Sequence, residues 1–490
     1  MLKREKSSQN MQKQEKETTI NYNEHNYGQI LRASGIFYFK KTENFKTTIS
    51  FLDYWKIKRN LETTIIASLR KMNGELVFRE KLEFNDSYVI NYSPNIVEKE
   101  FEGSIEIEIF SLEDMKIPYA GIMVVYESKF GVSMVHTYGR TYSHHEIEEE
   151  KTLRHGEETS CHAFEESEDT KSFAVVHNGN IICPKQNIEI SVLNYLGKRK
   201  NLTFELKELK PYETVRFNLK ELFPGIVEFL KGKPGYSSFS FSLNSSAFPR
   251  MLTIKQKNDN SDFQVTHSNF NLSKHKTPMI ENEKFAFMSL PNIPDVDEKV
   301  IVYPDCGDGE FEITTDCKNK INFNKDKGAE ISKNQTTDFF FRFEKVNDFI
   351  PTRIHTGVRI SKSSDRLSAE TCLGVFHKLH QEKRFFWGIC ANSHLKSRIF
   401  LQQMDLGEVE RKNLPVIIKL YSEKSKDSKE IQIDPRELKN GKYIHEIFSD
   451  TEEFLGSGFG WFTVFSEHPH YVIYSSLENK FGSMTFEHGI

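Results

Sequence analysis

The sequence predicts an all-β protein built from about four tandem β-sandwich modules, with short helical connections and a flexible N-terminal arm. One observation is a segment that recurs along the chain as an apolar strand, a polar turn and a second strand ending in histidine. A second is the period-two alternation of apolar residues just before these segments, as in Ile105, Ile107 and Ile109. A third is composition, since 40 Phe and 18 Tyr supply large apolar side chains for packed cores.

The recurring segment has the length and turn chemistry of a β-hairpin. Four stretches share it and end in histidine: 118–136, 249–267, the divergent 339–355, and 469–488. In the first and last stretches a Lys-Phe-Gly triplet lies in the turn. The preceding alternation predicts one buried face, and about six or seven strands in about 100 residues is typical of a β-sandwich.

The repeats divide the chain at approximate boundaries. We expect six parts. In chain order they are a disordered arm (1–26), a β-sandwich module (27–145), an acidic linker (146–170), a second module (171–275), a third, divergent module (276–362) and a fourth module (363–490). The linker prediction depends on charge, because 146–170 carries ten acidic residues against two basic ones.

Charge and hydropathy restrict the binding partners and the cellular compartment that we expect for this protein. The chain has 66 basic and 70 acidic residues, which gives no overall electrostatic reason to expect nucleic acid or an anionic membrane as partner. No apolar run has the length of a secretory signal or a membrane span. Six cysteines without a CxxC pair are typical of reduced thiols, so we expect a cytoplasmic protein.

Two of the histidines belong to a His-Thr-x-x-Arg pattern, His136 with Arg140 and His355 with Arg359. This pattern is similar to the last strand of the small β-sandwich in sensory-rhodopsin transducer proteins, over about a dozen residues per copy. The resemblance implies a sandwich and no function. Residues i and i+4 of a strand share a face, so these side chains form a candidate site for an anion such as a carboxylate or phosphate. The competing interpretation is structural, with each histidine bonding a loop at a sandwich corner.

A second candidate site is a metal centre in the acidic region. Four histidines lie there close in sequence: His144, His145, His155 and His162. Imidazoles and carboxylates together suit a divalent transition metal, although these spacings match no zinc-finger or zincin pattern.

The function that these patterns favour is a non-catalytic binding or scaffolding protein without a cofactor, because similar modules in series present extended surfaces. Its partner would be a small anionic or carbohydrate ligand or another protein. The alternative is an enzyme that depends on a divalent transition metal and acts on a carbohydrate or another small polar substrate. A third hypothesis is a homo-oligomer formed through exposed sheet edges.

Overall fold

The computed structural model of the protein describes residues 29–489 with several gaps. The gaps are 85, 97, 117–119, 137–156, 243–250, 269–284, 305–309, 317, 325, 333–339, 347–353, 364, 375, 378–384, 404–413 and 468–470. The described residues form mostly strands, arranged in eight antiparallel sheets. The prediction of an all-β, multi-module fold with short helices is therefore confirmed. The predicted N-terminal arm lies outside the described residues.

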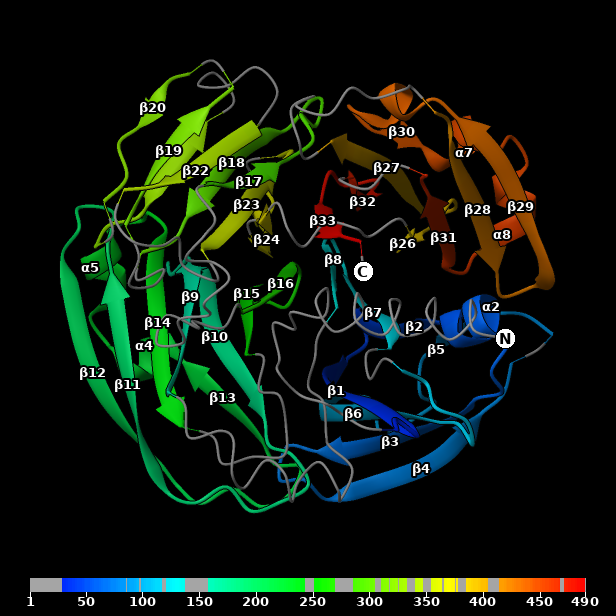
Figure 1. Ribbon diagram of the computed structural model, residues 1–490. Coiled ribbons are helices and arrows are strands. Elements are labelled where there is room, and N and C mark those ends of the chain that lie inside the picture. The colour runs from blue at the N-terminus through cyan, green and yellow to red at the C-terminus, as the bar shows by residue number, and fades with distance from the viewer. Residues whose placement is uncertain are drawn as a thin grey trace, which may run out of the picture.

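The strands fall into four consecutive groups, which we call modules 1 to 4 (Figure 1). Module 1 contains β1 (Arg32–Lys41), β2 (Phe45–Leu52), β3 (Thr64–Lys71), β4 (Leu76–Leu82), β5 (Val89–Tyr92), β6 (Phe101–Phe110), β7 (Gly121–Ser128) and β8 (Val132–Val135). Module 2 contains β9 (Glu157–Phe164), β10 (Thr170–His177), β11 (Gln186–Leu193), β12 (Arg199–Leu206), β13 (Thr214–Asn218), β14 (Gly235–Ser242), β15 (Leu252–Lys257) and β16 (Phe263–His267).

The second half of the chain continues in the same way. Module 3 contains β17 (Phe285–Ser289), β18 (Asp297–Val302), β19 (Phe311–Thr315), β20 (Lys320–Ile321), β21 (Ala329–Ser332), β22 (Phe340–Lys345), β23 (His355–Ser361), β24 (Ala369–Gly374) and β25 (Phe376–His377). Module 4 contains β26 (Phe385–Cys390), β27 (Leu395–Gln403), β28 (Val416–Ser422), β29 (Ser425–Ile433), β30 (Lys442–Tyr443), β31 (Gly460–Phe465), β32 (Tyr471–Asn479) and β33 (Met484–His488).

The helices of the described residues are all short connections between strands. They are α2 (Tyr54–Arg59), α4 (Leu219–Leu222), α5 (Ile226–Leu230), the 3-10 helix η3 (Pro435–Leu438), α7 (Ile444–Ile447) and α8 (Thr451–Leu455). In α2 the N-cap is Asp53, whose carboxylate accepts a hydrogen bond from the backbone N–H of Lys56. Among the residues that the structure describes, no helix has the length and apolar character that crossing a bilayer requires.

The same strand order recurs in all four modules. In module 1 one sheet has the order β1-β6-β3-β4 and the other the order β5-β2-β7-β8. The strands at the corresponding positions of modules 2, 3 and 4 pair in the same order, and module 3 adds β25 beside β17. The last strand of each order, at one edge of its sheet, is β8, β16, β24 or β33, and we call these four the central strands.

Each module closes a core between its two sheets. In module 2, Val176 of β10 shares one buried cluster with Ile188 and Ile190 of β11 and with Phe239 of β14. Ile188 and Ile190 are two residues apart and point to the same face, as the period of a strand requires. The core of module 2 is therefore a two-layer sandwich core of alternating apolar residues.

At the seams, part of the outer face of a sandwich is also buried, because a neighbouring module packs on it, whereas outer strands such as β12 and β29 are largely exposed. The prediction of a single buried face on β6 is incomplete, since Glu106 is buried between the apolar positions Ile105 and Ile107. Arg70 forms an ion pair with Glu106 and places its guanidinium 3.9 Å from the ring centroid of Tyr212 in module 2. Side-chain charges on this face are thus neutralised within a contact between modules.

Four such contacts close the modules into a ring, which Figure 1 shows from above. The rings of Tyr38 and Phe173 are in contact between modules 1 and 2, and those of Tyr236 and Tyr303 between modules 2 and 3. Hydrogen bonds join the other two seams, from Tyr474 Oη to Ser289 O between modules 4 and 3 and from Trp461 Nε1 to Ser50 Oγ. The last of these joins module 4 to module 1. Radial closure protects sheet edges that an open row of sandwiches would expose.

The central strands meet around the middle of the ring (Figure 1). At every seam they are joined by side-chain hydroxyls that bond to the backbone of the neighbouring strand. The bonds are Val265 N to Ser133 Oγ (2.9 Å), Cys372 N to Thr266 Oγ1 (3.3 Å), Thr371 Oγ1 to Phe486 O, and Met134 N to Thr485 Oγ1 (3.1 Å). Because Val132 N bonds to Ser483 Oγ two residues earlier in both strands, β8 and β33 run parallel. The same ends of the strands therefore lie on the same side of the ring.

Two details of the predicted division differ from the structure. Strand β9 lies inside the predicted acidic linker 146–170, where it pairs with β14 as the first strand of module 2. Strand β24 pairs with β23, so the last hairpin of module 3 extends beyond the expected boundary at residue 362. Charge alone did not distinguish a solvated linker from an acidic strand.

Candidate metal centre

Three central strands end at the same side of the ring in a histidine: His136 directly follows β8, His267 ends β16 and His488 ends β33. The sequence predicts hairpins at 118–136, 249–267 and 469–488, and the antiparallel ladders β7–β8, β15–β16 and β32–β33 lie in those stretches. Since β8, β16 and β33 come from modules 1, 2 and 4, the ring brings together residues that are far apart in the chain.

The three imidazoles and one carboxylate form a compact cluster. One ligand atom from each of His136, His267, Glu487 and His488 lies within 4.8 Å of the other three. The ring centroid of His136 is 4.5 Å from that of His267 and 4.5 Å from that of His488. Four ligands arranged tetrahedrally at bonds of about 2.1 Å lie about 3.4 Å from one another. Side-chain shifts of about 1 Å would therefore bring all four donors into coordination distance.

The carboxylate of Glu487 lies between two of the imidazoles. Its Oε1 is 3.4 Å from Nδ1 of His136 and 3.7 Å from Nε2 of His488. The side chains of Glu487 and His136 are each 2% exposed, so this carboxyl group is held away from solvent. Burial of a carboxylate is costly unless a positive charge compensates it, and a divalent cation provides that charge.

Backbone carbonyls orient two of the histidines. Nδ1 of His267 lies 3.1 Å from the carbonyl oxygen of Ser268, and Nδ1 of His488 lies 3.2 Å from that of Gly489. An imidazole that donates its Nδ1 proton to a carbonyl keeps the lone pair on Nε2, which is the tautomer found in metal-ligating histidines. The residue after each strand end thus fixes the ring for coordination through Nε2.

The donor set restricts the kind of ion. Three imidazole nitrogens and one carboxylate oxygen suit zinc, iron, manganese or nickel, whereas magnesium and calcium prefer oxygen ligands alone. One carboxylate leaves a divalent ion with a net charge of about +1, so the ion retains Lewis acidity.

The histidines and arginines predicted for an anion site are not all brought together. His136 belongs to the cluster, and Arg140 lies outside the described residues. His355 begins β23 and pairs with Gly374, so the interpretation of His355 as a histidine that ends a repeat is wrong. The stretch 339–355 joins β22 to β23 and is not the last hairpin of its module.

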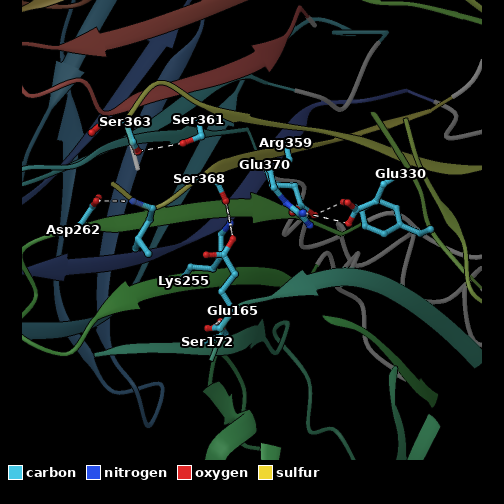
Figure 2. A network of polar contacts seen from close by, with 12 residues as sticks. Glu165, Ser172, Lys255, Asp262, Glu330, Arg359, Ser361, Ser363, Ser368 and Glu370 are labelled. Atoms are coloured by element: carbon cyan, nitrogen blue, oxygen red, sulfur yellow. Dashed lines mark hydrogen bonds and ion pairs between the residues drawn. The ribbon is translucent and has the colours of Figure 1, made fainter. Parts of the chain in front are cut away.

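Arg359 follows His355 on the same strand face, but four residues of strand separate their Cα atoms by about 13 Å. The Arg359 guanidinium lies 3.6 Å from Glu370 and 3.4 Å from Glu330 (Figure 2). Glu370 also accepts a hydrogen bond from Tyr303, and Glu330 accepts one from Tyr236 of module 2. Burial disfavours the charged guanidinium, but Glu370, Tyr236 and Glu330 raise the Arg359 pKa above its usual value. Arg359 is therefore part of a buried ion-pair network at the seam between modules 2 and 3.

A second part of this network lies beside it (Figure 2). Lys255 Nζ is 2.9 Å from Glu165 Oε1, which also accepts a hydrogen bond from Ser368 of module 3. Burial alone would raise the pKa of Glu165, but Lys255, Ser368 and Arg359 outweigh it and lower that pKa to about 2. Burial also raises the pKa of the neighbouring Cys372 thiol to about 12, which disfavours a nucleophilic thiolate. These residues link modules 2 and 3 through charge.

The predicted alternative metal region is in another part of the chain. His144, His145 and His155 lie outside the described residues. His162 is in strand β9, opposite Ser237 of β14. The described cluster combines the predicted His136 with His267 and His488, which were not predicted as site residues because they lack the accompanying arginine.

Glu487 was not singled out from the sequence at all. In the sequence, Glu487 stands out only because it directly precedes His488. That position indicates a ligand only once the three strands that end in histidine are known to lie side by side and to run in the same direction. Comparisons with known proteins add no family to this picture: no protein-family model matches the chain. No curated protein matches it either.

Proposed function

We propose that this protein binds one divalent transition-metal ion at the end of its central strands, through His136, His267, Glu487 and His488. The observation that carries the proposal is the approach of three imidazoles and one carboxylate, from three modules, to within 4.8 Å. This proposal keeps the predicted binding or scaffolding role and names the metal ion as the ligand that the four-module ring binds.

The orientation of the rings supports coordination over simple packing. A histidine with a purely structural role bonds a neighbouring loop, and this role does not require two further imidazoles and a buried carboxylate beside it. Carbonyl oxygens after His267 and His488 hold the tautomer in which Nε2 is the ligand atom.

The test is metal binding by protein purified without a polyhistidine tag. Elemental analysis should find about one equivalent of zinc, iron, manganese or nickel, and calorimetry of chelator-treated protein should give a 1:1 isotherm with zinc. The double variant Glu487→Gln, His488→Ala should weaken binding by at least ~100-fold, because outer-shell changes alone cost ~10–100-fold. Binding with unchanged affinity in that variant would reject this site.

A matched control lies on the surface of module 4. His445 and Glu446 are an exposed neighbouring pair on α7. The double variant Glu446→Gln, His445→Ala removes the same groups and should leave zinc affinity unchanged. If the Glu487 and His488 variant does not fold, His267→Gln tests the same site with a single substitution.

A second candidate function is a metal-dependent enzyme acting on a small polar substrate. The observation that favours it is the exposure of His488, whose side chain is 27% exposed beside ligands at 2% or less. Catalytic metal sites keep a coordination position that solvent or substrate can reach, whereas structural sites are closed.

Cobalt substitution distinguishes a closed site from an open one. The visible spectrum of the cobalt-loaded protein should change on addition of azide if a coordination position is accessible from the side of His488. A spectrum insensitive to azide would reject the enzyme and leave the binding function.

A further inference from the structure

We infer that the bound ion locks the ring at the seam where module 4 meets module 1, so that metal occupancy controls the release of strand β33. This inference rests on the proposed metal binding and concerns how that site is used. Its basis is the distribution of the ligands over the modules and the way in which the central strands are joined.

The seam between modules 4 and 1 differs from the other three in its covalent connection. Within residues 29–489 the chain passes directly from module 1 to 2, from 2 to 3 and from 3 to 4. Modules 4 and 1 are the last and first of this series. Among the described residues, side-chain packing and hydrogen bonds hold these two modules together and oppose their separation.

Within the described part of the chain, strand β33 is joined to β8 at this seam by side-chain hydroxyls and not by a backbone ladder. The described residues include no backbone ladder between these strands, which are joined by Val132 N to Ser483 Oγ at 3.0 Å and Met134 N to Thr485 Oγ1 at 3.1 Å. The antiparallel ladder of β33 is with β32, in its own module. Loss of the contact with β8 would therefore open the other edge of β33, the last strand of its sheet, to solvent.

The proposed ligands span this seam and the next. His136 follows β8 in module 1, His267 ends β16 in module 2, and Glu487 and His488 end β33 in module 4. One ion would connect the last strand of the series to the first two modules with bonds stronger than a hydroxyl-backbone hydrogen bond. Binding to the closed ring alone shifts the equilibrium toward closure in proportion to the ratio of ion concentration to Kd.

Module 3 provides an internal control for the effect of metal binding on the central strands. Its central strand β24 ends in Leu373 and Gly374 and contributes no ligand to the described cluster. Metal occupancy should consequently protect β8, β16 and β33 much more than β24, even though all four occupy the same place in their modules.

The experiment is hydrogen exchange with mass spectrometry on the full-length, untagged chain, with and without zinc. Peptides covering β8, β16 and β33 should exchange at least tenfold more slowly with zinc, while peptides from β24 and from the outer strands β4 and β29 should change less than twofold. In the Glu487→Gln, His488→Ala variant zinc should have no effect, and in the His445→Ala, Glu446→Gln control it should protect as in the wild type.

The outcomes separate this inference from the proposal beneath it. Absence of zinc binding in calorimetry rejects the metal site itself. Zinc binding at 1:1 with unchanged exchange in β33, or with equal protection of β24, leaves the metal site in place and overturns the lock.

Discussion

Three central strands end in an imidazole that belongs to the candidate metal centre, whereas the fourth, β24, ends in Leu373 and Gly374. Leu373 is level with His267, because Cys372 N bonds to Thr266 Oγ1 one residue earlier in both strands. Instead of a ligand, module 3 has the buried pair of Arg359 and Glu370, extended by the exposed Glu330, at its seam with module 2. The same strand order thus supports two kinds of polar contact, one that needs an ion and one that is neutralised within the protein.

The largest effect is expected from breaking the network of module 3. Arg359→Ala would leave the Glu370 carboxylate buried without its cation, and we expect a loss of about 3–5 kcal/mol of unfolding free energy. Guanidinium denaturation followed by fluorescence measures this loss. Arg436→Ala removes an arginine that pairs with Asp434 at the surface and should leave stability nearly unchanged. Equal effects of the two substitutions would mean that the network contributes nothing specific to module 3.

Acid should weaken the same seam. The pKa of Glu165 is lowered to about 2 in the folded protein, from 4.5 when unperturbed, so its carboxylate stabilises the fold above pH 4.5. This contribution should be lost progressively as the pH falls from 4.5 toward 2. At pH 7 we expect Glu165→Gln to cost about 1–3 kcal/mol, with the difference from wild type shrinking below pH 4.5. Urea denaturation at pH 7, 5 and 3.5 checks this, and a difference independent of pH would contradict it.

Converting module 3 to the pattern of the other modules is the next test. Leu373 is buried in the apolar cluster of module 3. Leu373→His places an imidazole at the level of His267, and if that imidazole turns out of the cluster toward the ion, we expect zinc affinity to rise about tenfold, or about 1.4 kcal/mol. Calorimetry compares this variant with Leu373→Gln, which adds polarity without an imidazole. Equal affinities in the two variants would mean that β24 does not face the ion.

The smallest effect is expected at the other histidine of module 3. His355 begins β23 and is not part of the described cluster, so His355→Gln should keep zinc affinity within about twofold of wild type. A loss as large as that of His267→Gln, measured in the same calorimetric titration, would place His355 among the ligands and remove the distinction between module 3 and the others.

Local patterns in the sequence predicted the strands well and the site only in part. The Lys-Phe-Gly turns and terminal histidines located the hairpins β7–β8 and β32–β33, because turn chemistry and alternation are local properties. The burial of Glu106 on the second face of β6 could not be predicted, since it depends on a neighbouring module. The cluster itself depends on ring closure, which no local pattern encodes.

The choice between equivalent residues was the main source of error. His355 resembled His136 in its Thr and Arg neighbours, yet it lies at the start of a strand and not at the end of a central one. His488 lacked those neighbours and is in the cluster. Whether a histidine belongs to the cluster depends on its position at the end of a central strand and not on the short shared motif.

The parallel course of the central strands gives the ring two chemically different sides. Strand ends with imidazoles lie on one side, and the turns that precede these strands, such as Lys129 to Gly131 and Lys480 to Gly482, lie at the opposite ends, about 16 Å away for five residues of strand. A fluorophore or surface anchor attached at Lys129 or Lys480 would therefore leave the imidazole side unobstructed, so the molecule could be immobilised in a single known orientation.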